Sequence, residues 1–313
     1  TRKESSAASD VYKRQGIKVA REALARSGVA ATAIESVIAG SMAQADFDAY
    51  MLPRHIGLYA GVPIATPSTL AQRICGTGFE LFRQAADQIA LGYARTALVV
   101  GTESMTRNPI AAYTHRSGFR LGAPVEFKDF LWEALDDPAA RVSMIQTAEN
   151  LARRYGITRP EVDAYASQSQ ARALAAQERG LFDEEIVTVD NEVLALEGYE
   201  PRAIRLPRKT AAQSRDTHPR HSPVEVLAGL RPVYEGGVQT AGNSSALVDG
   251  AAAAVVVHGG YLREHGLHAL ARLRGAAAAG VPPEIMGIGP VPAIQALLQL
   301  SLIHISEPTR QAE

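Results

Sequence analysis

The stretch Arg73-Ile74-Cys75-Gly76-Thr77-Gly78 contains the only cysteine of the 313-residue chain. The residues before it, 68–74, form a β-type run that predicts a strand. From Phe79 onward apolar residues recur at a spacing of about 3.6 as far as Gly92, which predicts a helix with a glycine stop signal. Cys75 is therefore expected at the junction between a strand and a helix.

Such a junction suits a nucleophile. Unpaired backbone N–H groups at a helix N-terminus carry about half a positive charge, and they stabilise a thiolate placed there. Gly76 and Gly78 would let the backbone approach a substrate closely. The alternative interpretation is that Cys75 is an inert, buried small residue.

Composition excludes several classes of protein. A chain with 46% hydrophobic and 21% charged residues is of ordinary globular type. Its net charge of −1 indicates no broad field for nucleic acid or a membrane surface. One cysteine excludes an intramolecular disulfide and a cysteine-based zinc site, and no apolar run approaches the roughly 20 residues that span a bilayer. We expect a cytoplasmic protein without a metal site.

Strand-like and helix-like segments alternate along the chain, which predicts an α/β fold with a parallel sheet covered on both faces. Between 105 and 200 longer polar loops and helices predominate, including a capping-box helix start at Thr158-Arg159-Pro160-Glu161, and they indicate a helical insertion. The expected strands are 35–40, 68–74, 96–101, 250–257 and 269–273. The expected helices are 16–27, 52–60, 79–91, 159–179 and 291–298. Residues 205–222 are expected to form an exposed loop.

The two ends differ in style from the rest. Residues 1–15 and 301–313 resemble translated sequencing-adapter sequence, and we expect them to be non-native tails that take no part in the fold. The alternative is that they are genuine disordered termini.

Five stretches resemble, in order, motifs of the thiolase family, the acyl-CoA C-acyltransferases that include acetyl-CoA acetyltransferase and 3-ketoacyl-CoA thiolase. The nucleophile motif of that family has a cysteine followed by Gly-Ser-Gly. The matching stretches are Arg73–Gly78, Gly101-Thr102-Glu103-Ser104-Met105, Met144-Ile145-Gln146-Thr147-Ala148-Glu149-Asn150, Thr240-Ala241-Gly242-Asn243-Ser244-Ser245 with Asp249-Gly250-Ala251-Ala252, and Pro283–Ala293.

The resemblance implies a layered αβα fold of two similar five-stranded halves, with a helical loop domain inserted in the first. It places the first part of the N-terminal half at 16–104, the loop domain at about 105–235, the return to the N-terminal half at 236–262 and the start of a truncated C-terminal half at 263–300. It also implies a homodimeric or homotetrameric parent enzyme.

Three family segments do not occur in the sequence: Asn-Glu-Ala-Phe, Gly-His-Pro with a catalytic histidine, and a second cysteine. The family's first strand is also absent before Gly16. We therefore expect an internal fragment without thiolase activity of its own. A sheet that lacks this central strand is expected to expose ladder edges and apolar helix faces, and so to be prone to aggregation.

The resemblance assigns roles to four residues. Cys75 is the catalytic acyl acceptor, Ser245 binds the pantetheine arm of CoA, Arg220 lies near its adenine and phosphate end, and Met144 lines the acyl pocket. Surface charge for Arg220 and core packing for Met144 are the alternatives. Acyl-CoA and CoA are implied as substrates, and no cofactor is.

Three other positions have structural interpretations. Ser143 stands where many members carry histidine, while Asn243 and Asp249 are expected to stabilise a turn and a helix start. Two other functions stay open. A ketoacyl synthase has the same fold, but its cysteine lies in an Ala-Cys-Ser-Ser setting that Ile74–Thr77 does not match. A thiolase-like lipid or acyl-CoA carrier without catalysis is the other.

Overall fold

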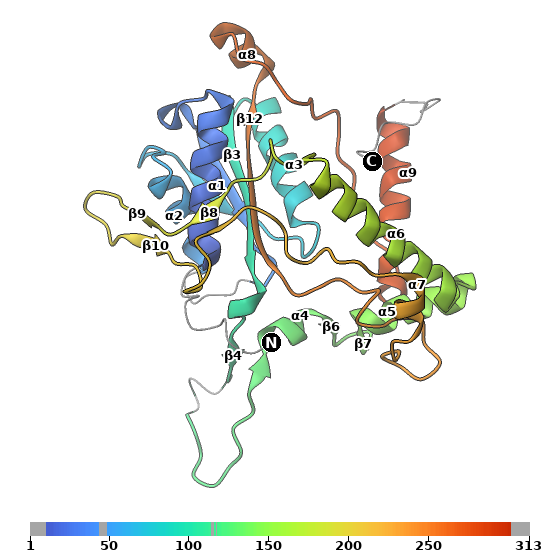
Figure 1. Ribbon diagram of the computed structural model, residues 1–313. Coiled ribbons are helices and arrows are strands. Elements are labelled where there is room, and N and C mark those ends of the chain that lie inside the picture. Colours follow the sequence, from blue (N-terminus) through green and yellow to red (C-terminus); the bar gives the residue numbers. More distant parts are fainter. Residues whose placement is uncertain (1–10, 44–48, 114–115, 117, 302–313) are drawn as a thin grey trace. The chain divides into compact units, whose positions relative to one another are not determined.

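The computed structural model describes residues 11–43, 49–113, 116 and 118–301, which form two compact units (Figure 1). Unit 1 extends to Leu131 and also includes Val187–Gln213 and Leu247–Leu273. Unit 2 contains Trp132–Ile186, Ser214–Ala246 and the described residues from Arg274 onward. Each unit is therefore assembled from segments that lie far apart in the sequence.

Among these residues the helices are α1 (Val11–Ser27), α2 (Leu52–Tyr59), α3 (Thr77–Ala90), α4 (Phe130–Ala134), α5 (Met144–Tyr155), α6 (Arg159–Glu178), α7 (Val224–Ala228), α8 (Gly259–His265) and α9 (Pro290–Ser301), with 3-10 turns η2 (Ala31–Ala33), η3 (Ala49–Met51), η4 (Met105–Arg107) and η5 (Pro283–Ile288). The strands are β1 (Ser36–Gly40), β2 (Ser68–Leu70), β3 (Thr96–Ser104), β4 (Ile110–Ala111), β5 (Lys128–Asp129), β6 (Asp136–Asp137), β7 (Val142–Ser143), β8 (Val189–Asp190), β9 (Glu192–Leu194), β10 (Arg202–Ile204), β11 (Ala212–Gln213) and β12 (Asp249–Val257).

Unit 1 is built on a four-stranded sheet in the order β12-β3-β1-β2. β1 runs parallel to both neighbours, with Gly40 opposite Gly101 of β3. β12 runs antiparallel along the whole length of β3. The sheet is therefore mixed, because the strand that returns last in the sequence enters in the opposite direction.

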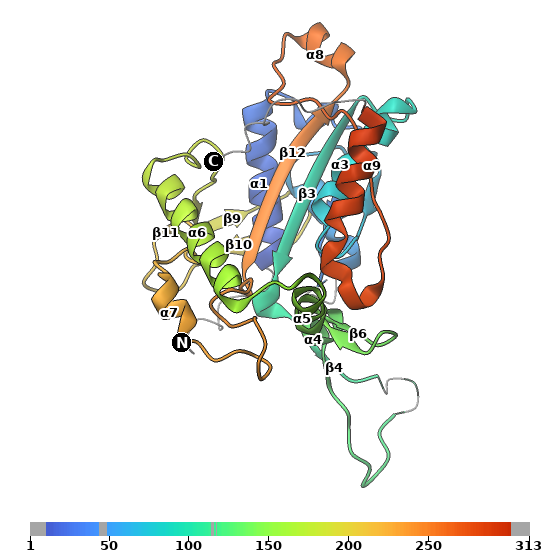
Figure 2. The same ribbon diagram turned by 90° about the vertical axis from the view of Figure 1, so that its right-hand side faces the viewer.

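The two faces of this sheet bury different helices. Val37, Ala39, Leu98 and Val100 face a core that contains α1 and α2, whereas the alternate residues Ile38, Ala97 and Val99 pack against Leu81 and Ala85 of α3. This alternation follows from the period of two in a strand. The expected helix face at Ile17, Ala20 and Leu24 is buried in the first core. Figure 2 shows α1 beside β12 and β3.

Most expected elements are present with shifted limits. α1 begins at Val11 rather than Gly16, so the expectation that residues 11–15 belong to a tail outside the fold was wrong. α3 begins at Thr77 rather than Phe79. α6 has both reciprocal hydrogen bonds of the predicted capping box, between Thr158 and Glu161. As expected, Gly92 adopts a positive φ after the end of α3.

Two other expectations were wrong. The strand expected over 68–74 ends at Leu70, because the chain leaves the ladder after the Ala71 N–H bonds the Ala39 carbonyl. Residues 269–273 form no strand. Among the described residues β1 pairs directly with β3 over Ser36–Gly40, and β2 and β12 are the outer strands, so the expectation of exposed ladder edges stays a prediction for these two strands.

Apolar exposure on α3 is nevertheless high. Phe79 is 84% and Phe82 41% exposed, although the helix buries Leu81 and Ala85 on its sheet face. When a helix has apolar residues on two sides, only one side can pack against the sheet, and the other side remains exposed to solvent. The expectation of an exposed apolar helix face is therefore confirmed for α3, while aggregation stays a prediction.

Unit 2 is held by helix contacts and buried polar groups. α5 packs against η5, and α6 packs against α7. Its buried residues include Glu149 and Asp163 beside Ala152, Ala176 and Leu227. Since the compact units interleave along the chain, they do not follow the domain limits expected from the family, and that division stays a prediction.

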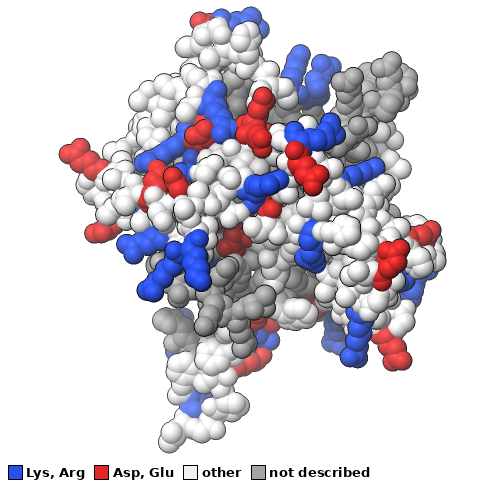
Figure 3. Space-filling view, in the orientation of Figure 1, with Lys and Arg blue, Asp and Glu red and all other residues white. Residues whose placement is uncertain are grey.

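Charge is mixed over the face shown in Figure 3, where Lys and Arg alternate with Asp and Glu. None of the helices in the described part of the chain is long and apolar enough to cross a membrane.

Candidate active site

Cys75 lies in a tight turn between β2 and α3. The residue is exposed, and it directly precedes Gly76, which is the N-cap of α3. The Gly76 and Thr77 N–H groups donate to the carbonyls of Arg73 and Ile74, at 2.9 and 3.1 Å. The thiol is therefore presented just outside the positive end of a 14-residue helix, as the sequence predicted.

This turn contains a strained residue that the sequence did not reveal. Ile74 has a φ of 45°, which is rare for a β-branched side chain because its Cβ crowds the backbone. Thr77 holds the conformation from two sides. Its Oγ1 accepts from the Arg73 N–H at 2.9 Å and donates to the Ile74 carbonyl at 2.6 Å. Thr77 is thus the residue that maintains the turn of Cys75.

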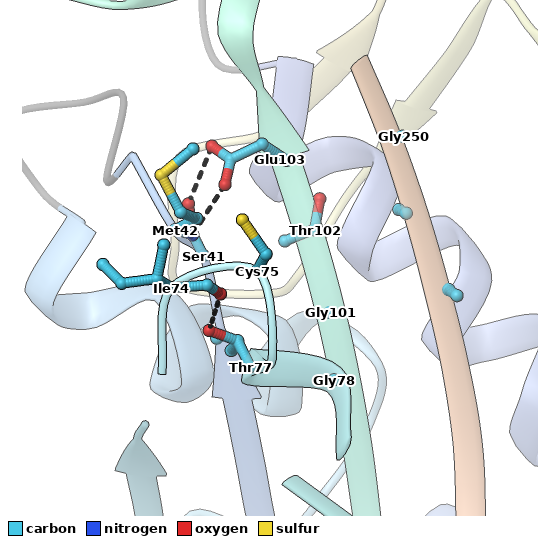
Figure 4. A pocket seen from close by; sticks show the side chains of 13 residues that line it. Ser41, Met42, Ile74, Cys75, Thr77, Gly78, Gly101, Thr102, Glu103 and Gly250 are labelled. Atoms are coloured by element: carbon cyan, nitrogen blue, oxygen red, sulfur yellow. Dashed lines mark hydrogen bonds between the residues drawn. The ribbon is translucent and has the colours of Figure 1, made fainter. Parts of the chain in front are cut away.

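Cys75 borders a pocket of about 370 Å³ that is open to solvent and is lined by residues of unit 1 alone (Figure 4). The lining comes from the ends of β1 and β3, from the turn before α3 and from the start of β12. Its members are Gly40, Ser41, Met42, Ile74, Cys75, Thr77, Gly78, Gly101, Thr102, Glu103, Gly250, Ala251 and Ala252.

Glycines leave room for this cavity. A Cβ on Gly78 or on Gly101 would meet no atom within 4 Å, so both borders are open. A Cβ on Gly40 would instead lie 2.3 Å from Thr77 Cγ2 and 2.5 Å from the Ala71 carbonyl oxygen. Gly40 is therefore required for the close approach of β1 to the Cys75 turn.

Glu103 supplies a carboxylate at the edge of the cavity. It accepts hydrogen bonds from the Met42 N–H at 2.6 Å, the Ala43 N–H at 3.1 Å and the Ser41 hydroxyl at 3.0 Å. The sequence pointed to Gly101–Met105 as a family motif but assigned no role to this glutamate. Its partners come from a loop 60 residues away, so no local pattern could have identified them.

A second carboxylate anchors the turn from the helix side. Glu80 is buried, and its carboxylate bonds the side chains of Arg83 and Gln84 and lies 3.4 Å from Arg73 Nε. The Arg83 guanidinium lowers the pKa of Glu80 to about 2, with smaller contributions from Gln84 and Arg73, while burial opposes the shift. Glu80 therefore stays ionised at neutral pH and joins Arg73 to α3.

The three expected CoA and acyl residues all lie in unit 2. Met144 is half-buried at the first position of α5, where Ser143 and Gln146 form a complete capping box. Ser143 is buried, and its hydroxyl lies 3.4 Å from that of Tyr234. The serine found where many family members carry histidine therefore caps a helix.

Ser245 is exposed on a loop whose base is rigid. The Asn243 side chain bonds the Thr240 N–H, the Val238 carbonyl and the buried Asp163, at 2.7, 2.9 and 2.8 Å. This confirms the expectation that Asn243 stabilises a turn.

Glu149 fixes the residues before this turn by accepting from the Val238 and Gln239 N–H groups, at 3.0 and 2.9 Å. Neither Glu149 nor Asp163 was assigned a role from the sequence.

Arg220 is also exposed, and its backbone N–H donates to the Gln170 side chain of α6 at 3.0 Å. Asp249 is the first residue of strand β12 rather than of a helix, and its side chain accepts from the Thr106 N–H of η4 at 3.0 Å. Within the described ranges no group of three His, Cys, Asp or Glu side chains is placed to hold a metal ion.

Known proteins share both the sequence and the fold. The family model "Thiolase, N-terminal domain" matches residues 3–259. Human mitochondrial 3-ketoacyl-CoA thiolase is 37% identical over 290 residues, which cover 92% of this chain and 70% of that protein. A β-ketothiolase of Cupriavidus necator is 37% identical over 296 residues, covering 93% of this chain and 71% of that protein.

Among solved structures, that of human mitochondrial 3-ketoacyl-CoA thiolase in complex with CoA matches with a TM-score of 0.85 and 35% identity, covering 93% of this chain and 70% of that one. The family match spans the Cys75 turn and the loop that ends at Ser245. This chain belongs to the thiolase family of acyl-CoA C-acyltransferases.

Proposed function

We propose that Cys75 is the acyl acceptor of a thiolase reaction that makes or cleaves 3-ketoacyl-CoA. The observation that carries this proposal is an exposed thiol at the N-terminal turn of α3, on a cavity, in a chain of this family. The thiolate attacks the thioester carbonyl, an acyl-cysteine bond forms, and CoA leaves as a thiolate that takes up a proton.

The second step needs a carbon nucleophile in the synthetic direction. A base removes an α-proton from a second acyl-CoA, the carbanion attacks the acyl-cysteine, and the cysteine thiolate leaves. Thiolysis is the reverse. The backbone N–H of Cys75 is suited to stabilise the oxyanion formed in each attack, where one donor contributes a few kcal/mol.

Ser245, Arg220 and Met144 are proposed to bind the pantetheine arm, the phosphate and adenine end, and the acyl group. The exposure of Ser245 and Arg220 leaves both side chains accessible to a ligand, and a guanidinium can contact phosphate and stack on adenine. The rigid base of the Ser245 loop supports the first assignment, because a preorganised loop loses less entropy on binding.

Covalent capture tests the role of Cys75. Incubation with acetyl-CoA is expected to place one acetyl group on Cys75, detected by intact-protein mass spectrometry, and Cys75→Ser should carry none. CoA binding without any acetylation of Cys75 would instead favour a non-catalytic acyl-CoA carrier.

The 313-residue chain by itself is expected not to turn over substrate, because it contains no Gly-His-Pro histidine and no second cysteine. A thiolysis assay should therefore give only the stoichiometric first step. Steady turnover that depends on Cys75 would contradict this expectation.

The CoA residues can be tested separately by calorimetry. Arg220→Ala and Ser245→Ala are each expected to weaken CoA binding about fivefold, the effect of about 1 kcal/mol for one hydrogen bond or exposed ion pair. Arg172→Ala, which removes an exposed arginine of α6, serves as the control. Equal affinities for all three variants would contradict the assignment.

Two further features are proposed from the composition and the family. The net charge of −1 and the single cysteine are consistent with a cytoplasmic protein. A homo-oligomer is proposed for the active enzyme, and size-exclusion chromatography with light scattering would test it.

A further inference from the structure

Met42 borders the same cavity as Cys75 but comes from a different part of the chain. It lies in the loop after β1, between the buried residues Ser41 and Ala43, and is itself half-buried. A group bound to the thiol would therefore share this pocket with the Met42 side chain. Figure 4 shows Met42, Cys75 and Glu103 around this part of the cavity.

The backbone of Met42 is held at both ends. Its N–H donates to Glu103 Oε2 at 2.6 Å, and its carbonyl accepts from the Gln72 side chain at 2.8 Å. Gln72 lies three residues before Cys75, so this hydrogen bond joins the Met42 loop to the segment that carries the thiol. Hydrogen bonds therefore tie the Met42 backbone to the segment that precedes Cys75.

Glu103 makes three of the hydrogen bonds that hold this loop. A carboxylate that accepts from two N–H groups and a hydroxyl makes charge-assisted hydrogen bonds, which are shorter and stronger than neutral ones. Glu103 stands near the end of β3, paired with Gly250 of β12, so its backbone belongs to the sheet. Through Glu103, the sheet thereby holds the loop Ser41–Ala43, which is not itself paired with a strand.

We propose that Met42 limits the size of the group that can reach Cys75, and that Glu103 is the positioning residue that keeps Met42 in place. This deepens, and rests on, the proposed role of Cys75 as acyl acceptor. A short, unbranched acyl group would fit beside Met42, whereas a bulky one would require the Ser41–Ala43 loop to move.

Alkylation of Cys75 tests the proposal without acyl transfer. N-methylmaleimide and N-cyclohexylmaleimide differ in bulk, and the single cysteine ensures that every adduct is on Cys75. The readout is the ratio of the second-order rate constants, bulky over small. Met42→Ala should raise this ratio about tenfold, the lower end of the effect of one apolar group in a pocket. Met51→Ala, an exposed methionine outside the cavity lining, should leave it unchanged.

Glu103 is tested by a double-mutant cycle. Glu103→Ala should raise the ratio severalfold, and Glu103→Gln should raise it less, because the amide oxygen can still accept one N–H. In a Met42→Ala background Glu103→Ala should have no further effect, since both changes act through the same side chain. A residue with a merely structural role would lower the melting temperature and leave the ratio unchanged.

Two results would overturn the proposal. One is an unchanged ratio in folded Met42→Ala protein. The other is an effect of Glu103→Ala that is equally large with and without Met42. A failure to acetylate Cys75 would reject the proposed function. The ratio of maleimide rate constants could still be measured in that case, because maleimide addition needs only an accessible thiol.

Discussion

Protonation of Glu80 should remove a measurable part of the stability of the Cys75 turn. The Glu80 residue is 6% exposed, and the Arg83 guanidinium, followed by Gln84 and Arg73, lowers the pKa of its carboxylate from the ordinary 4.5 to about 2. A folded-state pKa below the unfolded value means that the stabilisation is fully present above pH 4.5 and is lost as the pH falls towards 2.

The magnitude follows from the two pKa values. Their difference corresponds to about 3 kcal/mol at neutral pH. Arg83 and Arg73 are partly exposed, with side chains 37% and 51% accessible, so solvent screens their charges. We therefore expect Glu80→Gln to lower the free energy of opening of α3 by about 2 kcal/mol at pH 7.

Hydrogen exchange of the α3 amides, read by mass spectrometry between about pH 7 and pH 3 after correction for intrinsic exchange rates, provides the assay. The difference in the free energy of opening of α3 between the wild type and Glu80→Gln should shrink steadily below about pH 4.5, because the wild-type carboxylate then loses its charge. Glu22→Gln, which removes an exposed i,i+4 pair with Arg26, should cost less than about 1 kcal/mol. A Glu80→Gln deficit that is absent at pH 7, or constant across the whole pH range, would refute the reasoning.

Two further comparisons use matched residues. Gly40→Ala should destabilise unit 1 by about 1–3 kcal/mol in thermal or urea unfolding, because its Cβ would overlap Thr77 and a backbone oxygen. Gly101→Ala, directly opposite on β3, has open space and should cost less than about 1 kcal/mol; equal costs would contradict the packing argument. Asp163→Ala should lower the free energy of opening of α6, measured by hydrogen exchange, by about 3–5 kcal/mol, because it leaves Arg159 without its buried ion-pair partner. Asp87→Ala removes an exposed i,i+4 pair on α3 and should cost less than about 1 kcal/mol there, and similar losses at the two sites would exclude burial as the cause.

Local patterns in the sequence predicted the elements that carry their own signals. The capping box at Thr158–Glu161, the apolar face of α1 and the glycine stop after α3 all depend on residues within a few positions of one another, and all three are present. The limits were less accurate, as at Val11 and Leu70, because the last hydrogen bonds of an element depend on neighbours that the local sequence does not contain.

The pairing of β1 with β3 could not be read from either strand. Both are apolar runs that would pair with any strand of matching length, and the resemblance to the family placed a further strand centrally in this sheet. The strand expected at 269–273 fails for a related reason, since β-type residues form a strand only where a partner accepts their backbone hydrogen bonds.

The sequence by itself determined that one cysteine lies where an extended segment passes into a helix, and its ordered motifs identified the thiolase family, because these signals are contained in short stretches of the chain. Only the tertiary structure decided what surrounds that thiol. The positive φ of Ile74, the two hydrogen bonds of Thr77 and the Glu103 carboxylate on the Met42 loop arise when β1, β3 and the turn before α3 meet. The physical reason is distance along the chain, because a carboxylate acquires its partners from whichever backbone the fold brings to it.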